Sequence, residues 1–476
     1  MESVASHRKL NKGELFAFSF LVVPMAVIGL PLAIYIPPFY SGTLGLDLGA
    51  VGIVMMLARI TDVVTDPFIG RWSDRTRTRW GRRRPWVIAG VIVMVISSIM
   101  LFMPQIAVSN LYLFGWISAI YIGYTLIEIP YGAWGAEISG DYHERNRITG
   151  SRQMFSLIGL LVAITVPIIA SQGGGDHGTA ASRTSMAALG IITAVMLPIC
   201  AAILFRFVPE PSYHHTEPVA LRQGLRIALR NGPFRLILFT VMLGAVAGSV
   251  NAGVAILFLE HVAGLKSTQS SLLIFVLFAA AVIGSPVWVR IGGRYGKHRG
   301  VVLAGIISLC AFATVPAVIY WLKPIAPHWV FTALLCVTVV QGLTSSASPI
   351  LGASMLADVV DLDTLKSGEQ RTAFLFAFLA MISKIFQAAG VGIALPILSW
   401  VGFDAASHGN TPFALFMLTA MYCLVPLVLW VGCVVIIAQY PITHDRQQRL
   451  RGALERRLAR RAASRPVVDP LVQPAD

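Results

Sequence analysis

Long, predominantly apolar runs recur along this sequence, and they constrain its fold more than any other feature. Three of them cover residues 15–40, 86–103 and 413–437. About 20 consecutive apolar residues match the hydrocarbon core of a bilayer. Because the backbone must satisfy its own polar groups there, each run is expected to be a helix. We predict an all-α polytopic membrane protein with twelve transmembrane helices, at residues 14–40, 48–70, 86–105, 110–134, 153–172, 185–208, 233–260, 268–290, 301–322, 327–357, 372–402 and 412–440.

The charged residues support the same class and indicate an orientation. They make up 13% of the chain, whereas a soluble domain carries about 25%. The net charge is +14, but Lys and Arg gather in alternate loops and at both ends, which follows the positive-inside rule and argues against nucleic-acid binding. We therefore expect a multi-pass protein of the inner (plasma) membrane with both termini cytoplasmic. The exceptions to this pattern are Arg59, Arg183, Lys266, Lys323 and Lys384.

A short internal repeat predicts how the helices are grouped. An Asp-Pro pair at 66–67 precedes Arg71, and a Ser-Pro pair at 285–286 precedes Arg290 with the same spacing from proline to arginine. Two six-helix halves repeated in parallel are the architecture of the major facilitator superfamily. The expected parts are a six-helix bundle at 1–208, a cytoplasmic linker at 209–232 that is partly an amphipathic helix, a second six-helix bundle at 233–440, and a basic cytoplasmic tail at 441–476.

Ionisable residues within the predicted spans are few, and such residues are usually functional because charges are costly in a bilayer. The second span carries Arg59, Asp62, Thr65 and Asp66, whose spacing of three and four residues places them on one helical face. Two carboxylates and a hydroxyl offer oxygen ligands to a small cation, and Arg59 can pair with an Asp when no cation is bound. The alternative is a static salt bridge between helices.

The fourth and eleventh spans carry further polar candidates. Tyr124, Thr125 and Glu128 follow one another along the fourth span. Glu128 can accept hydrogen bonds from solute hydroxyls or bind a proton, and it can also simply pair with Arg152 of the fifth span. Lys384 lies in the eleventh span with no carboxylate within a turn of it. Its expected partners are therefore the acids of the first half, across a central cavity.

Enzyme motifs and cofactor sites are not recognisable in the sequence. Residues 292–297 look faintly like a phosphate-binding loop, but the glycine spacing is one residue short and no Ser or Thr follows Lys297. The five cysteines show no metal-ligand spacing. We expect no enzymatic activity, no cofactor, and no metal beyond a possible sodium ion at the cation site.

Taken together, these residues resemble the glycoside–pentoside–hexuronide:cation symporters, the family of the melibiose permease within the major facilitator superfamily. The resemblance extends over most of the chain. The motifs that carry it are Arg59–Pro67, Trp80-Gly81, Pro85-Trp86, Tyr124-Thr125, Glu128–Pro130, the stretch 145–152, Asp358–Asp361 and Lys384.

The resemblance implies roles for particular residues. It implies a cation site at Asp62, Thr65, Asp66 and Thr125, with Arg59 as a charge partner. Solute contacts are expected from Tyr124, Glu128, Arg152 and Lys384. The chain departs from the permease at Thr65, where the permease has Asn, at Glu128, which replaces Asp, and at Gly132, which replaces a Trp. These departures leave the choice between sodium and proton open and argue against melibiose itself as the solute.

We therefore predict a cation-coupled secondary transporter of a sugar, glycoside or related small polar solute. The alternative within transport is symport of a lysolipid or another amphipathic organic anion, and a non-transporting receptor is the alternative outside it. The expected partners are the solute, a monovalent cation and the lipid bilayer, and the protein is expected to work as a monomer.

A last prediction concerns an ionic gate at the cytoplasmic face. Asp358 and Asp361 end the tenth predicted helix, and arginines of both halves lie in neighbouring cytoplasmic loops. Opposite charges from the two halves can hold this face shut in an outward-open state. The alternative is ordinary surface charge, since exposed pairs contribute under about 1 kcal/mol. The predicted gate consists of Arg145, Arg290, Arg294, Asp358, Asp361 and Arg371.

Overall fold

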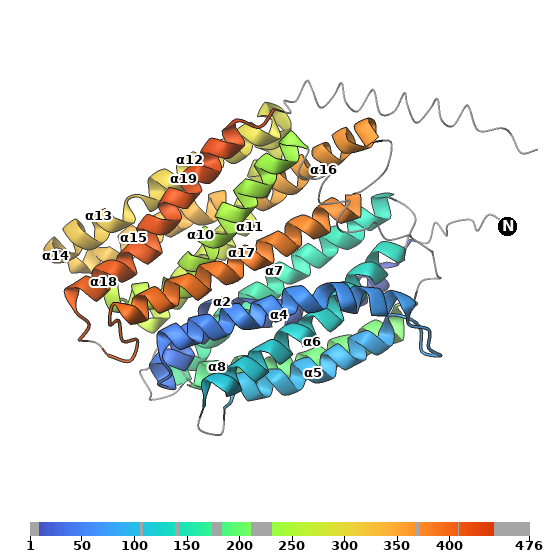
Figure 1. Ribbon diagram of the computed structural model, residues 1–476, viewed down its shortest axis with the longest axis horizontal. Helices are drawn as coiled ribbons and strands as arrows, with labels where there is room; N and C mark the ends of the chain where they lie inside the picture. The colour runs from blue at the N-terminus through green and yellow to red at the C-terminus, as the bar shows by residue number, and fades with distance from the viewer. Residues whose placement is uncertain are drawn as a thin grey trace, which may run out of the picture.

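The computed structural model describes residues 9–104, 108–138, 142–173, 183–210, 231–367, 372–407 and 409–441. Within them, twelve helical segments are long and apolar enough to cross a membrane, and the predicted all-α fold class is confirmed. Each segment overlaps one predicted span, with shifts at the ends. The fold can be followed in Figure 1.

Helices α1 to α8 form the first half of the molecule, and α10 to α19 form the second (Figure 1). The first half contains α1 (Lys12–Phe20), α2 (Val22–Ile34), α3 (Ile36–Pro38), η1 (Phe39–Thr43), α4 (Leu48–Arg75), α5 (Arg84–Phe102), α6 (Asn110–Glu137), α7 (Tyr142–Gly173) and α8 (Arg183–Phe207). The second contains α10 (Gly232–Leu257), η2 (Phe258–Val262), α11 (Ser267–Tyr295), α12 (Lys297–Phe312), α13 (Val315–Ala317), η3 (Val318–Leu322), α14 (Lys323–Ile325), η4 (Pro327–Trp329), α15 (Val330–Ser345), α16 (Ala347–Ser367), α17 (Thr372–Trp400), α18 (Pro412–Thr419), η5 (Ala420–Leu424) and α19 (Val425–Ala438).

The two halves repeat each other more closely than the sequence motif suggested. The first long helix of each half ends in a π-helical turn, η1 and η2, and each turn is followed by a glycine with positive φ, at Gly45 (79°) and Gly264 (74°). That backbone conformation favours glycine because it has no Cβ. These glycines are separated by the same residue offset as the prolines Pro67 and Pro286, which lie inside α4 and α11.

Two predicted boundaries need correction. The tenth span does not end near residue 357, because α16 continues to Ser367. Asp358 therefore lies within the helix, where Lys297 neutralises it. The fifth span likewise begins earlier than predicted, because α7 extends back to Tyr142, where an ion pair joins the buried Glu144 to the exposed Arg147. Most of the predicted linker and nearly all of the predicted tail lie outside the described residues.

The halves meet closely at one end of the bundle, which we call the Asp47 end. There α4 packs against α17, and the two helices run side by side between the halves (Figure 1). A Cβ at Gly52 would lie only 2.7 Å from Leu395 Cβ, so the contact requires a residue without a side chain. Ser399 Oγ donates a hydrogen bond of 2.6 Å to Asp47 Oδ2 across the same seam. The opposite end of the bundle, where α16 and the N-terminal part of α1 lie, is called the Asp358 end.

Candidate functional site

A carboxylate pair in α4 faces a hydroxyl of α6. Asp62 and Asp66 lie one helical turn apart, and Thr125 Oγ1 is 2.6 Å from Asp62 Oδ1 and 2.9 Å from Asp66 Oδ1. A hydroxyl has one hydrogen, so Thr125 donates to one carboxylate at a time. Asp62 is only 1% exposed. Three oxygen-bearing side chains from two helices thus converge in the interior of the first half.

Two cationic side chains neutralise this carboxylate pair. Lys384 reaches across from α17, with its Nζ 2.6 Å from Asp66 Oδ2 and 3.1 Å from Asp62 Oδ2. Arg59 Nη1 lies 3.3 Å from Asp62 Oδ2, and its guanidinium lies over the Tyr121 ring at 4.7 Å from the centroid. Because Lys384 belongs to the second half, its ion pairs with Asp62 and Asp66 join the two halves at the centre of the molecule. This is the pairing expected for Lys384 from the sequence.

Thr65, also predicted as a cation ligand, is oriented differently. Its hydroxyl donates to the backbone carbonyl of Asp62 at 3.0 Å, as threonines within helices commonly do. Its proton is therefore directed to its own helix rather than to the carboxylates, and its role in cation binding stays a prediction.

Three of the four predicted solute contacts lie on α6 and α7, and the fourth, Lys384, lies on α17. Arg152 Nη2 is 2.9 Å from Glu128 Oε1, so the pairing considered as the alternative role of Glu128 is present. The Arg152 guanidinium also lies 4.5 Å from the centroid of the Tyr131 ring, and the Tyr131 hydroxyl donates to Phe18 O at 2.6 Å. This ring fixes the position of Arg152, while the Glu128 side chain remains 40% exposed.

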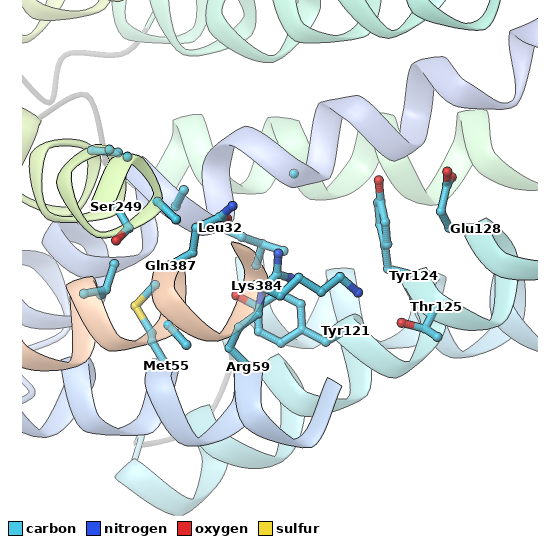
Figure 2. Close-up of a pocket in the computed structure, with 18 of the residues that line it drawn as sticks. Leu32, Met55, Arg59, Tyr121, Tyr124, Thr125, Glu128, Ser249, Lys384 and Gln387 are labelled. Carbon is cyan, nitrogen blue, oxygen red and sulfur yellow. The ribbon is translucent and has the colours of Figure 1, made fainter. Parts of the chain in front are cut away.

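A cavity of about 580 Å³ lies between the halves, beside these charges. Figure 2 shows Arg59 from α4, Tyr124 and Glu128 from α6, and Lys384 and Gln387 from α17 around it. The volume lies within the usual range for sites that take small molecules, about 300–1,000 Å³. The wall contributed by α10 differs from the others, because it consists mainly of small residues: Gly244, Ala245, Gly248, Ser249 and Ala252.

Sequence reasoning missed several of the cavity residues. Gln387 and Tyr121 both line the cavity but were not singled out. Both lie about one helical turn from a predicted site residue, Gln387 after Lys384 and Tyr121 before Thr125, so helical periodicity could have identified them. Ser249 carried no comparable signal, because its span shows no other polar marker that the sequence analysis used.

The structure describes the side chains of only part of the predicted gate. Asp358 is buried, and its carboxylate contacts Lys297 Nζ at 2.7 Å. Lys297 belongs to the same half, and the sequence analysis did not assign it to the gate. Arg290 and Arg294 are exposed. The side chains of Arg145 and Asp361, and all of Arg371, lie outside the described residues.

A tyrosine near the Asp358 pair is held neutral. The Tyr440 hydroxyl donates to Met355 O at 3.1 Å. Burial, and secondarily the nearby Asp358 carboxylate, raise the pKa of Tyr440 above its ordinary value. It therefore acts as a hydrogen-bond donor that ties the end of α19 to α16.

Proteins similar to this chain in sequence are symporters or carriers by name. Residues 17–444 match the family described as MFS/sugar transport protein. The putative glycoside/cation symporter YagG of Escherichia coli (strain K12) is 25% identical over 436 residues, covering 90% of each chain. The glucuronide carrier protein homolog of the same organism is 22% identical, covering 86% of this chain and 88% of that protein. The human sodium-dependent lysophosphatidylcholine symporter 1 is 24% identical, covering 85% of this chain and 78% of that protein.

Solved structures show the same fold at lower sequence identity. The nucleoside transporter NupG superposes with a TM-score of 0.63 at 14% identity, covering 90% of this chain and 98% of that chain. A bacterial homologue of the human lysosomal transporter Spinster superposes with a TM-score of 0.62 at 14% identity, covering 93% and 96%.

Proposed function

The chain belongs to the MFS/sugar transport protein family, and from that premise we propose that it is a cation-coupled symporter of a sugar, glycoside or related small polar solute, working by alternating access. The observation that carries this proposal is the position of Lys384. Its ammonium, which comes from the second half, lies between two carboxylates of the first half. The Lys384 ammonium, held between these carboxylates, can be exchanged for a coupling cation from solution.

The first step of the proposed cycle is cation binding. A monovalent cation binds to the carboxylates of Asp62 and Asp66 and to the Thr125 oxygen, and it displaces the Lys384 ammonium. Both sodium and a proton can compete in this way, since hard oxygen ligands suit sodium and a carboxylate can be protonated. Displacement breaks the central ion pairs between α4 and α17, so cation binding changes how strongly the halves are joined.

The second step is solute binding in the cavity. Glu128 accepts hydrogen bonds from solute hydroxyls, and Arg152 and Tyr124 donate to solute oxygens. Hydrogen bonds to charged groups contribute about 1.5–3 kcal/mol each, so two of them can select a polyhydroxylated solute. The small residues of the α10 wall leave room for the ring of a sugar or for its aglycone.

That same α10 wall favours the second candidate function, symport of an amphipathic lipid. Glycine and alanine predominate on it, and an alkyl chain can pack there while a polar head group contacts Arg59 and Lys384. Lysophospholipids therefore belong in any solute screen beside sugars and glycosides.

Alternating access is supported by the contacts at the Asp47 end. Gly52 and Ser399 bring α4 and α17 together there, and at the Asp358 end the Asp358 carboxylate pairs with Lys297 of its own half. We place the termini, and with them the Asp358 end, in the cytoplasm, so the contacts at the Asp47 end close the outer side of the site. The predicted gate, in which Asp358 and Asp361 meet arginines of both halves, belongs to the outward-open conformation.

A two-stage experiment tests the proposal. Thermal shift of the purified protein against sugars, glycosides and lysophospholipids, with and without sodium, identifies solutes, because a ligand that binds the native state stabilises it. Uptake into proteoliposomes under a sodium or proton gradient then measures transport. Cation-dependent accumulation of one solute class supports the proposal. Ligand binding without any gradient-driven flux points to a receptor instead.

A further inference from the structure

Helix α1 is a separate element from α2, although the two belong to one membrane span. α1 ends at Phe20, and α2 begins at Val22. The break at Leu21 follows from the sequence, because Pro24 has no N–H to donate to the Phe20 carbonyl four residues earlier. The position of α1 is therefore set largely by the helices that pack along it, α7 and α8.

The start of α1 is held by an ion pair of α7. The N–H of Leu10 donates to Glu144 Oε1 at 3.0 Å, and Arg147 Nη1 donates to the Leu10 carbonyl at 3.0 Å. The same Arg147 atom lies 3.0 Å from Glu144 Oε1. One ion pair thus binds both backbone groups of the residue that precedes the N-cap, Asn11. The beginning of α1 is therefore fixed to α7, the helix that also carries Arg152.

The other end of α1 makes two contacts that lead to Arg152. Ser19 Oγ donates to Ser151 Oγ at 2.7 Å, and Ser151 directly precedes Arg152 in α7. The Tyr131 hydroxyl of α6 donates to the Phe18 carbonyl. The rings of Phe18 and Tyr131 also stack, with centroids 4.5 Å apart and an interplanar angle of 23°, and both are fully buried.

These contacts form a column that ends at a guanidinium. Phe18 covers one face of the Tyr131 ring, so the Arg152 guanidinium, 4.5 Å from the same centroid, lies over the other face. A Cβ at Gly135 would lie 3.0 Å from Phe18 Cζ, so the Phe18 ring packs directly against α6. Arg152 Nη2 in turn donates to Glu128 Oε1 at 2.9 Å, and Glu128 lines the cavity. A chain of direct contacts therefore runs from α1 to the cavity wall.

We propose, resting on the symporter function above, that Phe18 and Ser19 of α1 are positioning residues. Through Tyr131 and Ser151 they hold Arg152 in the orientation in which it contacts the solute. Ordering a long side chain when a ligand binds lowers affinity about two- to tenfold. The column orders Arg152 when the protein folds, so its guanidinium is in place before the solute arrives. Solute affinity thus depends on how α1 is seated against α6 and α7.

The experiment measures solute affinity by isothermal titration in sodium buffer. The probes are methyl β-glucoside, methyl β-glucuronide and lysophosphatidylcholine, and the one that binds the parent most tightly is used for all variants. Tyr131→Leu removes the stack and should weaken binding about tenfold. Tyr131→Phe keeps the ring but loses the hydrogen bond to α1, so we expect about threefold. Ser151→Ala, which removes the other hydrogen bond, should also weaken binding about threefold.

Tyr112→Phe is the matched control. The Tyr112 hydroxyl makes the same kind of bond, to the Met100 carbonyl at 2.6 Å, elsewhere on α6. The loss of this bond does not affect the column, so this variant should bind the solute as the parent does.

A double-mutant cycle separates positioning from general damage to the fold. If Tyr131 acts through Arg152, Tyr131→Leu should cause no further loss of affinity in an Arg152→Ala background. The response of the melting temperature to sodium alone, which reports on Asp62 and Asp66, should stay at the parent level in every variant. A general loss of structure would change that response.

The outcomes decide between the two proposals. Parent-level affinity in both Tyr131→Leu and Ser151→Ala overturns the positioning proposal and leaves the symporter function standing. A full tenfold loss from Tyr131→Leu when Arg152 is already alanine overturns it too, because the ring would then act without Arg152. Ser151→Ala decides the matter even where Tyr131→Leu does not fold. If no probe binds the parent or accumulates in proteoliposomes under a sodium or proton gradient, the symporter function fails, and the positioning proposal fails with it.

Discussion

Replacing Asp62 by Asn gives a prediction whose size follows from the structure. The change keeps the shape of the side chain but leaves one carboxylate, Asp66, facing two cations, Arg59 and Lys384. Asp62 is only 2% exposed in its side chain, whereas Lys384 and Asp66 are 26% and 24% exposed. Removing one partner of a buried ion pair costs about 3–5 kcal/mol. Because two of the partners are partly hydrated, we expect a loss near the lower end, about 3 kcal/mol.

A double mutant separates charge balance from simple loss of contacts. Lys384→Met alone leaves two carboxylates with one cation, so it should also destabilise the protein. In the double mutant Asp62→Asn/Lys384→Met, Asp66 and Arg59 balance each other. The double mutant should therefore be more stable than the sum of the two single losses predicts, by about 1–3 kcal/mol, as is usual for residues in direct contact.

Thermal unfolding in detergent measures this effect. The four proteins are compared in choline chloride, so that no sodium can replace Lys384. We expect both single mutants to melt below the parent, and the double mutant to melt at or above the less stable single mutant. If the two single shifts simply add in the double mutant, the ion pairs are not balanced as described here and the reasoning is refuted.

Three further predictions concern the solute, the gate and the Asp47 end. Glu128→Gln and Arg152→Ala should each weaken solute binding about tenfold or more by isothermal titration, because each removes a charge-assisted hydrogen bond; unchanged affinity in both would exclude them as primary contacts. Replacing both Asp358 and Asp361 by Asn should increase the labelling of single cysteines placed in the cytoplasmic half of the cavity, and labelling at the parent level in a folded protein would show that the acids are only structural. Asp47→Ala should increase the labelling of single cysteines in the half of the cavity toward the Asp47 end, because it removes a hydrogen bond that joins the halves. No increase would mean that helix packing alone closes the Asp47 end.

The spans could be predicted from the sequence because their signal is local. Twenty apolar residues can span a bilayer wherever they stand in the chain, and the internal repeat around Pro67 and Pro286 indicated the two halves. The partner of Lys384 was predictable for a related reason. A lone cation at membrane depth needs an acid, and Asp62 and Asp66 were the available pair.

Contacts set by tertiary packing were not predictable in the same way. The sequence analysis paired Asp358 with arginines of both halves, whereas the structure shows an ion pair with Lys297, which is brought close by the tight turn at Gly296 between α11 and α12. The Ser399–Asp47 hydrogen bond joins residues far apart in the chain, and no local pattern marks it. The orientation of Thr65 depends on a choice between a backbone and a side-chain partner, which helical periodicity does not determine.

Gradient-driven uptake is the most direct test of the central claim that Asp62 and Asp66 hold the coupling cation. A solute identified by thermal shift is offered to proteoliposomes that contain the parent protein, Asp62→Asn or Asp66→Asn, with and without an inward cation gradient. We predict that the parent accumulates solute against its gradient, whereas both mutants lose accumulation and keep part of their downhill exchange, because the solute contacts of Glu128 and Arg152 are intact. Full uphill accumulation by both single mutants would contradict the assignment of these carboxylates as the cation site.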